Sequence, residues 1–235
     1  MAEHPWKRVE RIGDCTLYLG DCLEVMPHLG GGFDVFTDPP YGIGAGTGVG
    51  RQNRKRFQAA GKTWDDNPPP PEFFRLAKAM SVEQIYWGGN YFDLPPTRCY
   101  LIWDKGLTLR GRDFAEAELA WTSLDANIRV LTLEGSQAHR NTVKVHPTQK
   151  PLKLTEWGLG FLTSKRPVLD PFMGSGTTGV ACAKLGRRFV GIERDPDYFE
   201  VACNRIGNAH SEFADYSDAA SGQAGFSFDN RPRSD

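Results

Sequence analysis

The chain has 235 residues, of which 40% are hydrophobic and 24% are charged, and its formal net charge is -1 at pH 7. This is the composition of a globular protein, long enough for one α/β domain with a substantial core, and it excludes a disordered chain. The near-zero charge also excludes a uniformly basic nucleic-acid-binding protein, so any basic surface must come from local clustering.

Hydropathy and cysteine usage narrow the class further. The sequence has no run of about 18 apolar residues, and its first residues lack the apolar core of a signal peptide. We therefore expect no membrane span and no secretory signal. The five cysteines form no C-x-x-C pair and the five histidines show no ligand spacing, so the sequence predicts no metal site and no disulfide framework. This pattern favours a cytoplasmic protein.

The first part of the chain predicts a compact βαβ unit. After a polar leader over residues 1–13, its expected strand, helix and strand are Thr16–Leu19, Cys22–Leu29 and Phe33–Thr37. Each of the two strands is followed by an aspartate, Asp21 after the first and Asp38 after the second. Both carboxylates are therefore expected at the ends of strands.

The second strand leads into the tetrapeptide Asp38-Pro39-Pro40-Tyr41. Two consecutive prolines exclude helix, fix the backbone and donate no N–H, so the carbonyls around them stay free to accept hydrogen bonds. The result is a rigid corner that carries a carboxylate, free carbonyls and an aromatic ring. Such a corner suits a flat substrate with an amino group on its edge, although an ordinary turn at a strand end is the alternative.

A glycine-rich and basic stretch, residues 42–63, follows this corner. Its cations are Arg51, Arg54, Lys55, Arg56 and Lys62. A stretch so poor in apolar residues is not able to bury itself, and a solvated surface loop is one interpretation. Its place directly after the Pro-Pro corner favours another, a mobile flap that closes over an anionic partner.

The middle of the chain predicts a helix and further strands. The helix is Glu72–Met80, after a run of prolines, and the strands are Gln84–Trp87, Cys99–Trp103, Glu116–Trp121 and Ile128–Leu133. Trp87, Trp103 and Trp121 are expected to be core or pocket-wall aromatics. Residues 105–146 are locally basic, and Arg110, Arg112 and Arg140 are candidates for contact with nucleic acid.

The last third of the chain predicts a nucleotide-type loop. After a helix over Leu152–Leu162, the strand Arg166–Leu169 leads into Asp170 and the pattern G-x-G-x-x-G, which opens a helix over Thr177–Leu185. The next strand, Arg188–Ile192, ends at Glu193, 19 residues after Gly174, where a carboxylate can accept hydrogen bonds from both ribose hydroxyls. This context predicts a nucleoside-containing cofactor but does not identify it, since NAD also fits the pattern.

The chain is expected to close with a helix that begins at Asp195 and Pro196. Tyr198, Ala202 and Ile206 mark its buried face. From Gly207 onward the sequence is rich in small and polar residues and shows no periodicity. We therefore expect a flexible tail over residues 207–235.

Taken together, these motifs resemble those of the DNA amino-methyltransferases, the S-adenosylmethionine-dependent enzymes that methylate adenine N6 or cytosine N4. Asp38 to Tyr41 matches the catalytic motif of that family, and Asp170 to Thr178 matches its cofactor motif. His146 to Pro151 and Gly20 to Cys22 look like two further family segments. The resemblance covers roughly Asp14 to Ile206, and the catalytic motif precedes the cofactor motif, as in the permuted β class.

The resemblance implies a fold. This is an α/β, Rossmann-like, doubly wound sheet of seven mostly parallel strands, with helices on both faces, one antiparallel strand and a circularly permuted order of motifs. It further implies one methyltransferase domain over residues 1–206, with a target-recognition segment within about 105–146. That segment is short for the family. Either the recognised sequence is short or loosely specified, or a second subunit of a homodimer supplies part of the recognition region.

The resemblance also implies roles for individual residues. Asp38 and the Pro39 carbonyl would accept hydrogen bonds from the target amine, within the catalytic motif Asp38, Pro39, Pro40 and Tyr41, and Tyr41 would stack on a flipped-out base. Cofactor contacts are implied for Asp21, Cys22, Lys150, Asp170, Phe172, Gly174, Ser175, Gly176, Thr177, Thr178 and Glu193. The partner is then DNA, held by basic residues, and the family association with restriction–modification follows.

Several alternatives stay open at this stage. Aspartate as the first residue of the catalytic motif resembles the adenine-N6 members, whereas serine is commoner among the cytosine-N4 members. Methylation of RNA or of a protein amide is a second possibility, because Pro-Pro-Tyr corners serve planar amides and amines generally. A non-catalytic nucleic-acid-binding module that keeps the fold is a third, and a nicotinamide dehydrogenase is the most distant.

Overall fold

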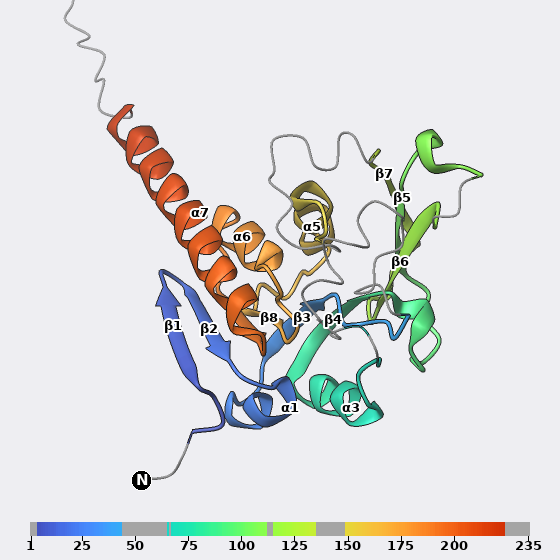
Figure 1. Cartoon of the computed structure of the whole chain (residues 1–235). Coiled ribbons are helices and arrows are strands. Elements are labelled where there is room, and N and C mark those ends of the chain that lie inside the picture. Colours follow the sequence, from blue (N-terminus) through green and yellow to red (C-terminus); the bar gives the residue numbers. More distant parts are fainter. Residues whose placement is uncertain (1–3, 44–64, 66, 112–114, 135–148, 224–235) are drawn as a thin grey trace, which may run out of the picture.

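The protein, seen in a computed structural model, is described over residues 4–43, 65, 67–111, 115–134 and 149–223. These residues contain nine strands that form one sheet (Figure 1). The strands are β1 Arg8–Ile12, β2 Cys15–Leu19, β3 Phe33–Thr37, β4 Ser81–Trp87, β5 Tyr100–Asp104, β6 Ala117–Thr122, β7 Arg129–Thr132, β8 Val168–Asp170 and β9 Phe189–Glu193. Their spatial order is β1-β2-β9-β8-β3-β4-β6-β5-β7.

The sheet confirms the doubly wound, mostly parallel architecture but corrects the strand count. The described residues form nine strands rather than seven, and two of them, β1 and β6, run against their neighbours. The reversed strand at β6 is the antiparallel strand that the resemblance implies. One of the two additional strands is β1, which lies in the part of the chain that sequence patterning assigns to a polar leader and which pairs with β2 along its whole length.

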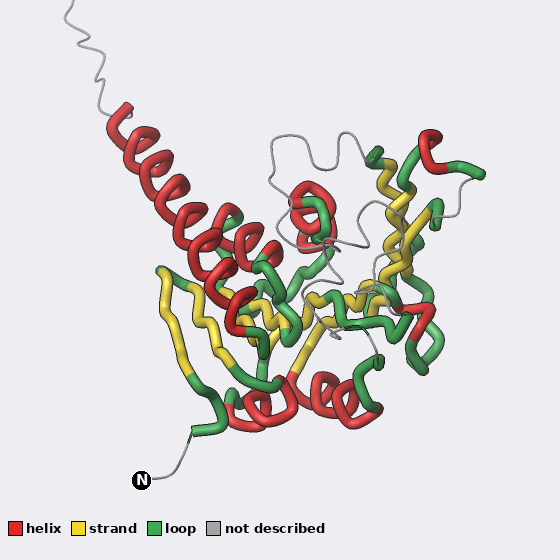
Figure 2. Tube along the Cα trace, viewed as in Figure 1, coloured by secondary structure: helices red, strands yellow, loops and turns green. Residues whose placement is uncertain are grey.

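Helices cover both faces of the sheet (Figure 2). Their bounds, with the three 3-10 turns, are α1 Cys22–Val25, η1 Met26–His28, α3 Pro71–Met80, η3 Gly89–Tyr91, η4 Leu107–Leu109, α5 Leu152–Leu159, α6 Thr177–Lys184 and α7 Pro196–Gln223. One core cluster packs α5, α6 and α7 against the sheet, and a second packs α1 and α3 against the other face. Both layers are needed because β3, at the centre, is buried at every position.

The predicted elements are present, with ends shifted by a few residues. The expected helix Cys22–Leu29 is instead a single α-helical turn followed by η1, which contains Pro27, a residue without a backbone N–H to donate. Trp87, Trp103 and Trp121 are all buried, as expected.

The end of the chain requires a second correction. The flexible tail expected from Gly207 is wrong for residues 207–223, because α7 continues without a break to Gln223. Ile206 and Ala209 are buried, so the helix is still packed against the domain beyond the point where the sequence pattern fades. Once nucleated, a helix extends at little cost even through residues that lack an apolar stripe. Residues 224–235 lie outside the described part of the chain.

An ion pair holds the amino end of the central strand. Asp34 of β3 is 0% exposed and accepts hydrogen bonds from Arg187 Nη2 at 3.0 Å and Ser164 Oγ at 2.5 Å. The Arg187 guanidinium also donates to the Arg166 carbonyl at 2.9 Å. The loops before β8 and before β9 are thereby tied to β3. The opposite, carboxyl end of the same strand is occupied by Asp38.

None of the helices in the described ranges combines the length and the apolar character that a membrane crossing requires.

Candidate active site

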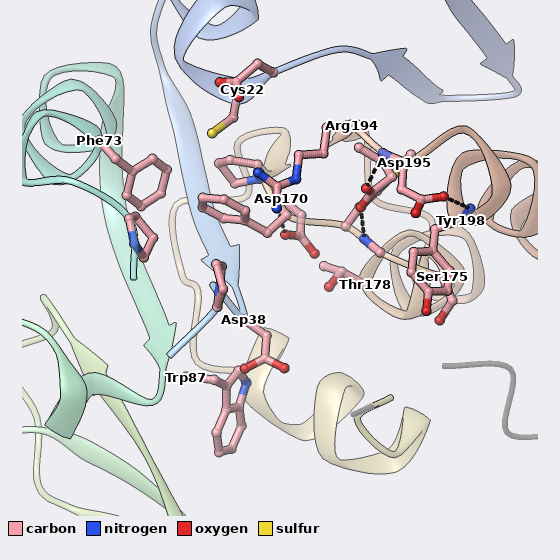
Figure 3. Close-up of a pocket in the computed structure, with 18 of the residues that line it drawn as sticks. Cys22, Asp38, Phe73, Trp87, Asp170, Ser175, Thr178, Arg194, Asp195 and Tyr198 are labelled. Atoms are coloured by element: carbon pink, nitrogen blue, oxygen red, sulfur yellow. Dashed lines mark hydrogen bonds between the residues drawn. The ribbon is translucent and has the colours of Figure 1, made fainter. Parts of the chain in front are cut away.

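A cavity of about 830 Å³ opens at the carboxyl ends of β2, β3, β8 and β9 (Figure 3). This is the edge at which ligands bind in open parallel sheets. In the view of Figure 3, Asp38 and Trp87 lie toward one end of the cavity, and Asp195 and Tyr198 toward the other. The structure brings together, from segments far apart in the sequence, the predicted site residues Asp21, Cys22, Asp38, Pro40, Lys150, Asp170, Phe172, Gly174, Ser175, Thr177, Thr178 and Glu193.

The glycine loop between β8 and α6 uses its glycines in two different ways. Gly174 and Gly176 both have positive φ, 51° and 78°. A Cβ added at Gly176 would lie 2.9 Å from the Ala202 Cβ, so this glycine lets α7 pack closely on the loop. A Cβ added at Gly174 would meet nothing within 4 Å. Because Gly174 lines the cavity, its bare backbone leaves room for a ligand.

Glu193, at the end of β9, holds the loop in place. Its carboxyl oxygens accept the Gly174 N–H at 2.9 Å and the Asp195 N–H at 2.7 Å. Burial raises the pKa of Glu193 to about 7, against the opposing effect of these two hydrogen bonds. The side chain is therefore poised to change its charge near neutral pH.

Asp170 links the two predicted motifs. Its Oδ1 accepts the Thr37 hydroxyl at 2.7 Å and the Phe172 N–H at 3.2 Å. Burial raises the pKa of Asp170 to about 6, although hydrogen bonds from Thr178 and Thr37 lower it. Because Thr37 directly precedes Asp38, this buried bond fixes the Pro-Pro corner relative to the glycine loop.

At the Pro-Pro corner, both oxygens of the Asp38 carboxylate have partners. Oδ1 accepts the Tyr41 hydroxyl at 2.6 Å, and Oδ2 accepts the Lys150 ammonium, also at 2.6 Å. Lys150 also donates to the Tyr41 hydroxyl at 3.1 Å. Lys150, for which the resemblance implies a cofactor contact, thus directs its charge to the catalytic corner.

The aromatic ring of the corner is held from two sides. The Tyr41 backbone N–H donates to Asp65 Oδ1 at 2.6 Å, and the Gly42 N–H donates to the same oxygen at 3.1 Å. The Tyr41 ring is stacked on Tyr91, with 4.8 Å between centroids and 14° between planes. One face of the ring is therefore already covered, which the expectation of base stacking by Tyr41 did not foresee.

Two charged residues extend this corner toward β5 and β6. Glu118 Oε2 lies 3.1 Å from the Lys150 ammonium, and Glu118 Oε1 lies 2.7 Å from the ammonium of Lys105. Burial would raise the pKa of Glu118, but Lys150 and Lys105 outweigh it and lower this pKa to about 2. Burial also raises the pKa of Asp38. The neighbouring Lys150 opposes this effect, but the pKa of Asp38 stays above its ordinary value. The pKa of Lys150, lowered by burial but raised more strongly by Asp38 and Glu118, stays well above its usual value.

Sequence reasoning missed several lining residues. Phe73 of α3 meets Phe172 edge to face at 4.9 Å, and Arg194 and Tyr198 line the cavity beyond Glu193. Glu118 was not singled out at all. Trp87 was expected only as a core or pocket-wall aromatic, and its place at a strand end before two glycines is the signal that could have pointed to the site.

The predicted residues outside the cavity fall into four groups. Pro39 and Tyr41 belong to the corner itself, and Gly176 caps the start of α6. Arg110 is exposed, beyond η4. The remaining predicted nucleic-acid contacts lie outside the described residues, as does His146: these contacts are Arg51, Arg54, Lys55, Arg56, Lys62, Arg112 and Arg140. Within the described ranges, no group of three or more histidine, cysteine, aspartate or glutamate residues is arranged to hold a metal ion.

Comparison with known proteins gives matches in sequence. A family model described as DNA methylase, of the N6/N4 type, matches residues 102–204, a range that contains the glycine loop but begins after the Asp38 corner. The Type II methyltransferase M2.MboI of Moraxella bovis is 33% identical over 144 residues, which are 61% of this chain and 47% of that protein. The chain therefore spans about half the length of this curated relative.

Solved structures match the fold. The M1.HpyAVI-SAM complex has a TM-score of 0.57 at 24% identity and covers 81% of this chain and 99% of its own. The cytosine-N4-specific PvuII DNA methyltransferase has a TM-score of 0.58 at 16% identity and covers 89% of this chain and 96% of its own. The Rossmann-like α/β fold and the resemblance to the DNA amino-methyltransferases are thus confirmed.

Proposed function

We propose that this chain, which matches the N6/N4 DNA methylase family in sequence and its structures in fold, is an S-adenosylmethionine-dependent DNA methyltransferase that modifies adenine N6. The observation that carries this proposal is the meeting of two motifs at one cavity. The Asp38 corner and the glycine loop follow two adjacent parallel strands, β3 and β8, and the buried bond from Thr37 to Asp170 joins them at 2.7 Å.

The cavity suits a nucleoside-containing cofactor. Glu193 and Asp21 line the cavity and would accept hydrogen bonds from the ribose hydroxyls and from the adenine amino group, and the Gly174 backbone leaves space for the ligand. Phe172 and Phe73 supply an apolar wall for the adenosyl group. Thr177 and Thr178, in the first turn of α6, would hold the methionine carboxylate at the positive end of the helix. S-Adenosylmethionine, when bound, supplies an electrophilic methyl group on a sulfonium.

The corner would prepare the nucleophile. The exocyclic amine of a base is a poor nucleophile because its lone pair is delocalised into the ring. Hydrogen bonds from the amine to the Asp38 carboxylate and the Pro39 carbonyl would favour a pyramidal nitrogen with an available lone pair, held in line for transfer. The surplus proton then leaves to water or through Asp38. Tyr41 is set to contact the base with its ring edge or with the face that Tyr91 does not cover.

The substrate would reach this corner as an unpaired base. A base inside a duplex is too far from a recessed carboxylate, so it must be flipped out or already single-stranded. The basic residues predicted to bind nucleic acid, Arg110 among the described ones, would contact phosphates, which position the DNA without specifying its sequence. A homodimer could supply recognition surface that the short segment 105–146 lacks.

Adenine is favoured over cytosine by a single residue, the aspartate at position 38. The cytosine-N4 alternative has the PvuII methyltransferase in its favour, because that enzyme shares the fold and is specific for cytosine N4. Mass analysis of nucleosides from DNA treated with the purified protein and S-adenosylmethionine would separate the two. We expect N6-methyladenine, and N4-methylcytosine in its place would refute this choice.

Replacing the carboxylate at the corner tests the mechanism. We expect Asp38→Ala to reduce methylation by at least about 100-fold, since a preorganised hydrogen-bond acceptor at the reacting atom is removed. Binding of S-adenosylmethionine, measured by calorimetry, should persist. Asp93→Ala, which removes an exposed carboxylate, is the control and should keep full activity. Substantial methylation by the Asp38 variant would remove this residue from the mechanism.

The identity of the polymer needs its own experiment. Purified protein would be offered duplex DNA, single-stranded DNA, RNA and protein with radiolabelled S-adenosylmethionine, and the modified DNA would then be sequenced. We expect label on DNA at a defined sequence. Transfer to RNA or protein alone would overturn the choice of DNA, and cofactor binding without any transfer would favour a non-catalytic module.

A further inference from the structure

The catalytic carboxylate is fully engaged before any base arrives. The Tyr41 hydroxyl and the Lys150 ammonium each lie 2.6 Å from one of the two Asp38 oxygens. The Asp38 side chain is 26% exposed, so the cavity can reach it, but an incoming amino group must take over a position that one of these donors now fills. Which donor yields, and where it goes, then decides how the base binds.

Lys150 has a second carboxylate within reach. Its ammonium lies 3.1 Å from Glu118 Oε2 while it contacts Asp38, and its side chain is only 11% exposed. A lysine this buried that lost its only carboxylate would be left as an unpaired charge, which is strongly unfavourable. Glu118 removes that penalty, because Lys150 can release Asp38 and remain paired.

Glu118 itself is held in place. Its other oxygen lies 2.7 Å from the Lys105 ammonium, and Lys105 in turn lies over the Trp103 ring, 5.1 Å from the centroid. The reversed direction of β6 puts Glu118, near the start of that strand, at the same edge of the sheet where the parallel strands end. The antiparallel strand thus delivers a carboxylate to the corner from a segment that carries no recognisable motif.

We propose that Glu118 is a positioning residue for the reaction: it shares the Lys150 ammonium with Asp38, so that the amino group of the target base can replace Lys150 at Asp38 while Lys150 stays paired. This inference rests on the proposed function, since it assumes that an amino group is the group that enters. It assigns Glu118 no contact with the base, and it makes Lys150 the group that moves.

The groups that surround Asp38 predict that its pKa shifts in opposite directions in two variants. Lys150 and Tyr41 face the carboxylate as donors, while Glu118 and Asp170 are the nearby anions. Glu118→Gln removes an anion and leaves Lys150 to Asp38 alone, so the pKa of Asp38 should fall and the base should compete against a tighter pair. Lys150→Met removes the cation, so the pKa of Asp38 should rise.

The kinetic consequences follow from these signs. In Glu118→Gln, the KM for DNA should rise by about three- to tenfold, the effect of one hydrogen bond of ordinary net strength, and the acid limb of the pH–rate profile should move to lower pH. In Lys150→Met, the acid limb should move to higher pH, because Asp38 must be ionised to accept the amine. Lys150→Arg should restore most of the wild-type profile.

A readout that does not depend on methylation separates this inference from the proposed function. Protein labelled with 13C at the aspartate carboxyl carbons is titrated by NMR, and the Asp38 resonance is identified by its loss in Asp38→Asn. Glu116→Gln, a change of the same kind at an exposed glutamate two positions earlier, is the control and should leave the Asp38 titration in place. Thermal unfolding of each variant checks that it is folded.

The outcomes are distinct. Opposite shifts of the Asp38 titration in Glu118→Gln and Lys150→Met, with a raised KM in the former, support the proposal. An active enzyme in which neither variant moves the Asp38 titration overturns it. If the two variants shift the Asp38 titration in opposite directions but the protein methylates no nucleic acid, the sharing of the Lys150 ammonium is supported. The entry of a base amine and the proposed function are then both refuted.

Discussion

The charge of Glu193 would influence how tightly the cavity binds its ligand. This side chain takes two backbone N–H groups, from Gly174 and Asp195, and its pKa, raised by burial to about 7, leaves it partly protonated at neutral pH. Ribose hydroxyls donate to the ionised carboxylate better than to the protonated acid. Cofactor affinity is therefore coupled to the charge of this one side chain.

The coupling predicts a pH dependence of cofactor binding. Because the ionised form of Glu193 is the better acceptor, the Kd for S-adenosylmethionine should fall about tenfold between pH 6 and pH 8, the change in ionised fraction for a group with this pKa. Calorimetry over that range measures it. Glu193→Gln should bind more weakly and without this pH dependence, whereas a wild-type Kd that is constant from pH 6 to 8 would contradict the prediction.

At the residue scale, sequence reasoning found the residues that stand in a motif and missed those that do not. Asp38 and Glu193 could be predicted because each follows a strand with a recognisable neighbour, the prolines in one case and the glycine loop in the other. Glu118 could not, since it reaches the corner only through the pairing of β6 with β4 and β5. The Tyr41–Tyr91 stack likewise depends on how η3 folds back after β4.

Among the elements, the junction of α6 with α7 rests on a glycine. Gly176 is in the left-handed region and its missing Cβ leaves space for Ala202 of α7, whereas Gly174, two residues earlier, faces open space. The two glycines of one loop therefore serve different ends. Gly176 allows close packing of α7, and Gly174 is proposed to leave room for the ligand.

Alanine substitutions should separate these roles. Gly176→Ala should lower the free energy of unfolding by about 2–4 kcal/mol, from backbone strain together with the clash with α7. Gly174→Ala should cost only about 1 kcal/mol in stability but weaken cofactor binding, because its Cβ would project beside the cavity. Urea unfolding and calorimetric binding measure the two effects. The prediction is wrong if both variants lose stability equally.

Element prediction succeeded where an apolar period was present and failed at the two ends of the chain. The strands of the core and the helices α3, α5 and α6 carry such patterns. The edge strand β1 does not, because an edge strand buries little and its sequence, RVERI, is largely charged. The continuation of α7 beyond Ile206 was missed for a related reason, since Ala209 is the one buried residue among residues 207–212, whose burial the structure describes.

Over the whole molecule, the central strand β3 separates stability from chemistry. Its amino end is anchored by Asp34, buried against Arg187, and its carboxyl end delivers Asp38 to the cavity. Truncating one partner of a buried ion pair is costly because the other charge stays behind. Two aspartates four positions apart on one segment thus have unrelated tasks.

This division predicts that Asp34→Ala destabilises the fold without abolishing the reaction. The free energy of unfolding should fall by about 3–5 kcal/mol, the usual cost of leaving a buried charge unpaired. Urea unfolding measures the loss, and methylation at low temperature, corrected for the folded fraction, should remain close to wild type. Glu10→Ala, which breaks the exposed Arg8–Glu10 pair, is the control and should cost less than about 1 kcal/mol.

The pairing of β2 with β9 determines when, during synthesis, this part of the sheet can form. Leu19 pairs with Glu193, so β2, the strand before Asp21, has no partner on that side until the residues up to Glu193 have left the ribosome. At about 5–20 residues per second this delay lasts roughly 10–35 s. Contacts of such long sequence separation form slowly, and until then the early segment is exposed to mispairing. The cofactor, whose proposed contacts include both Asp21 and Glu193, can therefore stabilise the fold only after β9 has been synthesised.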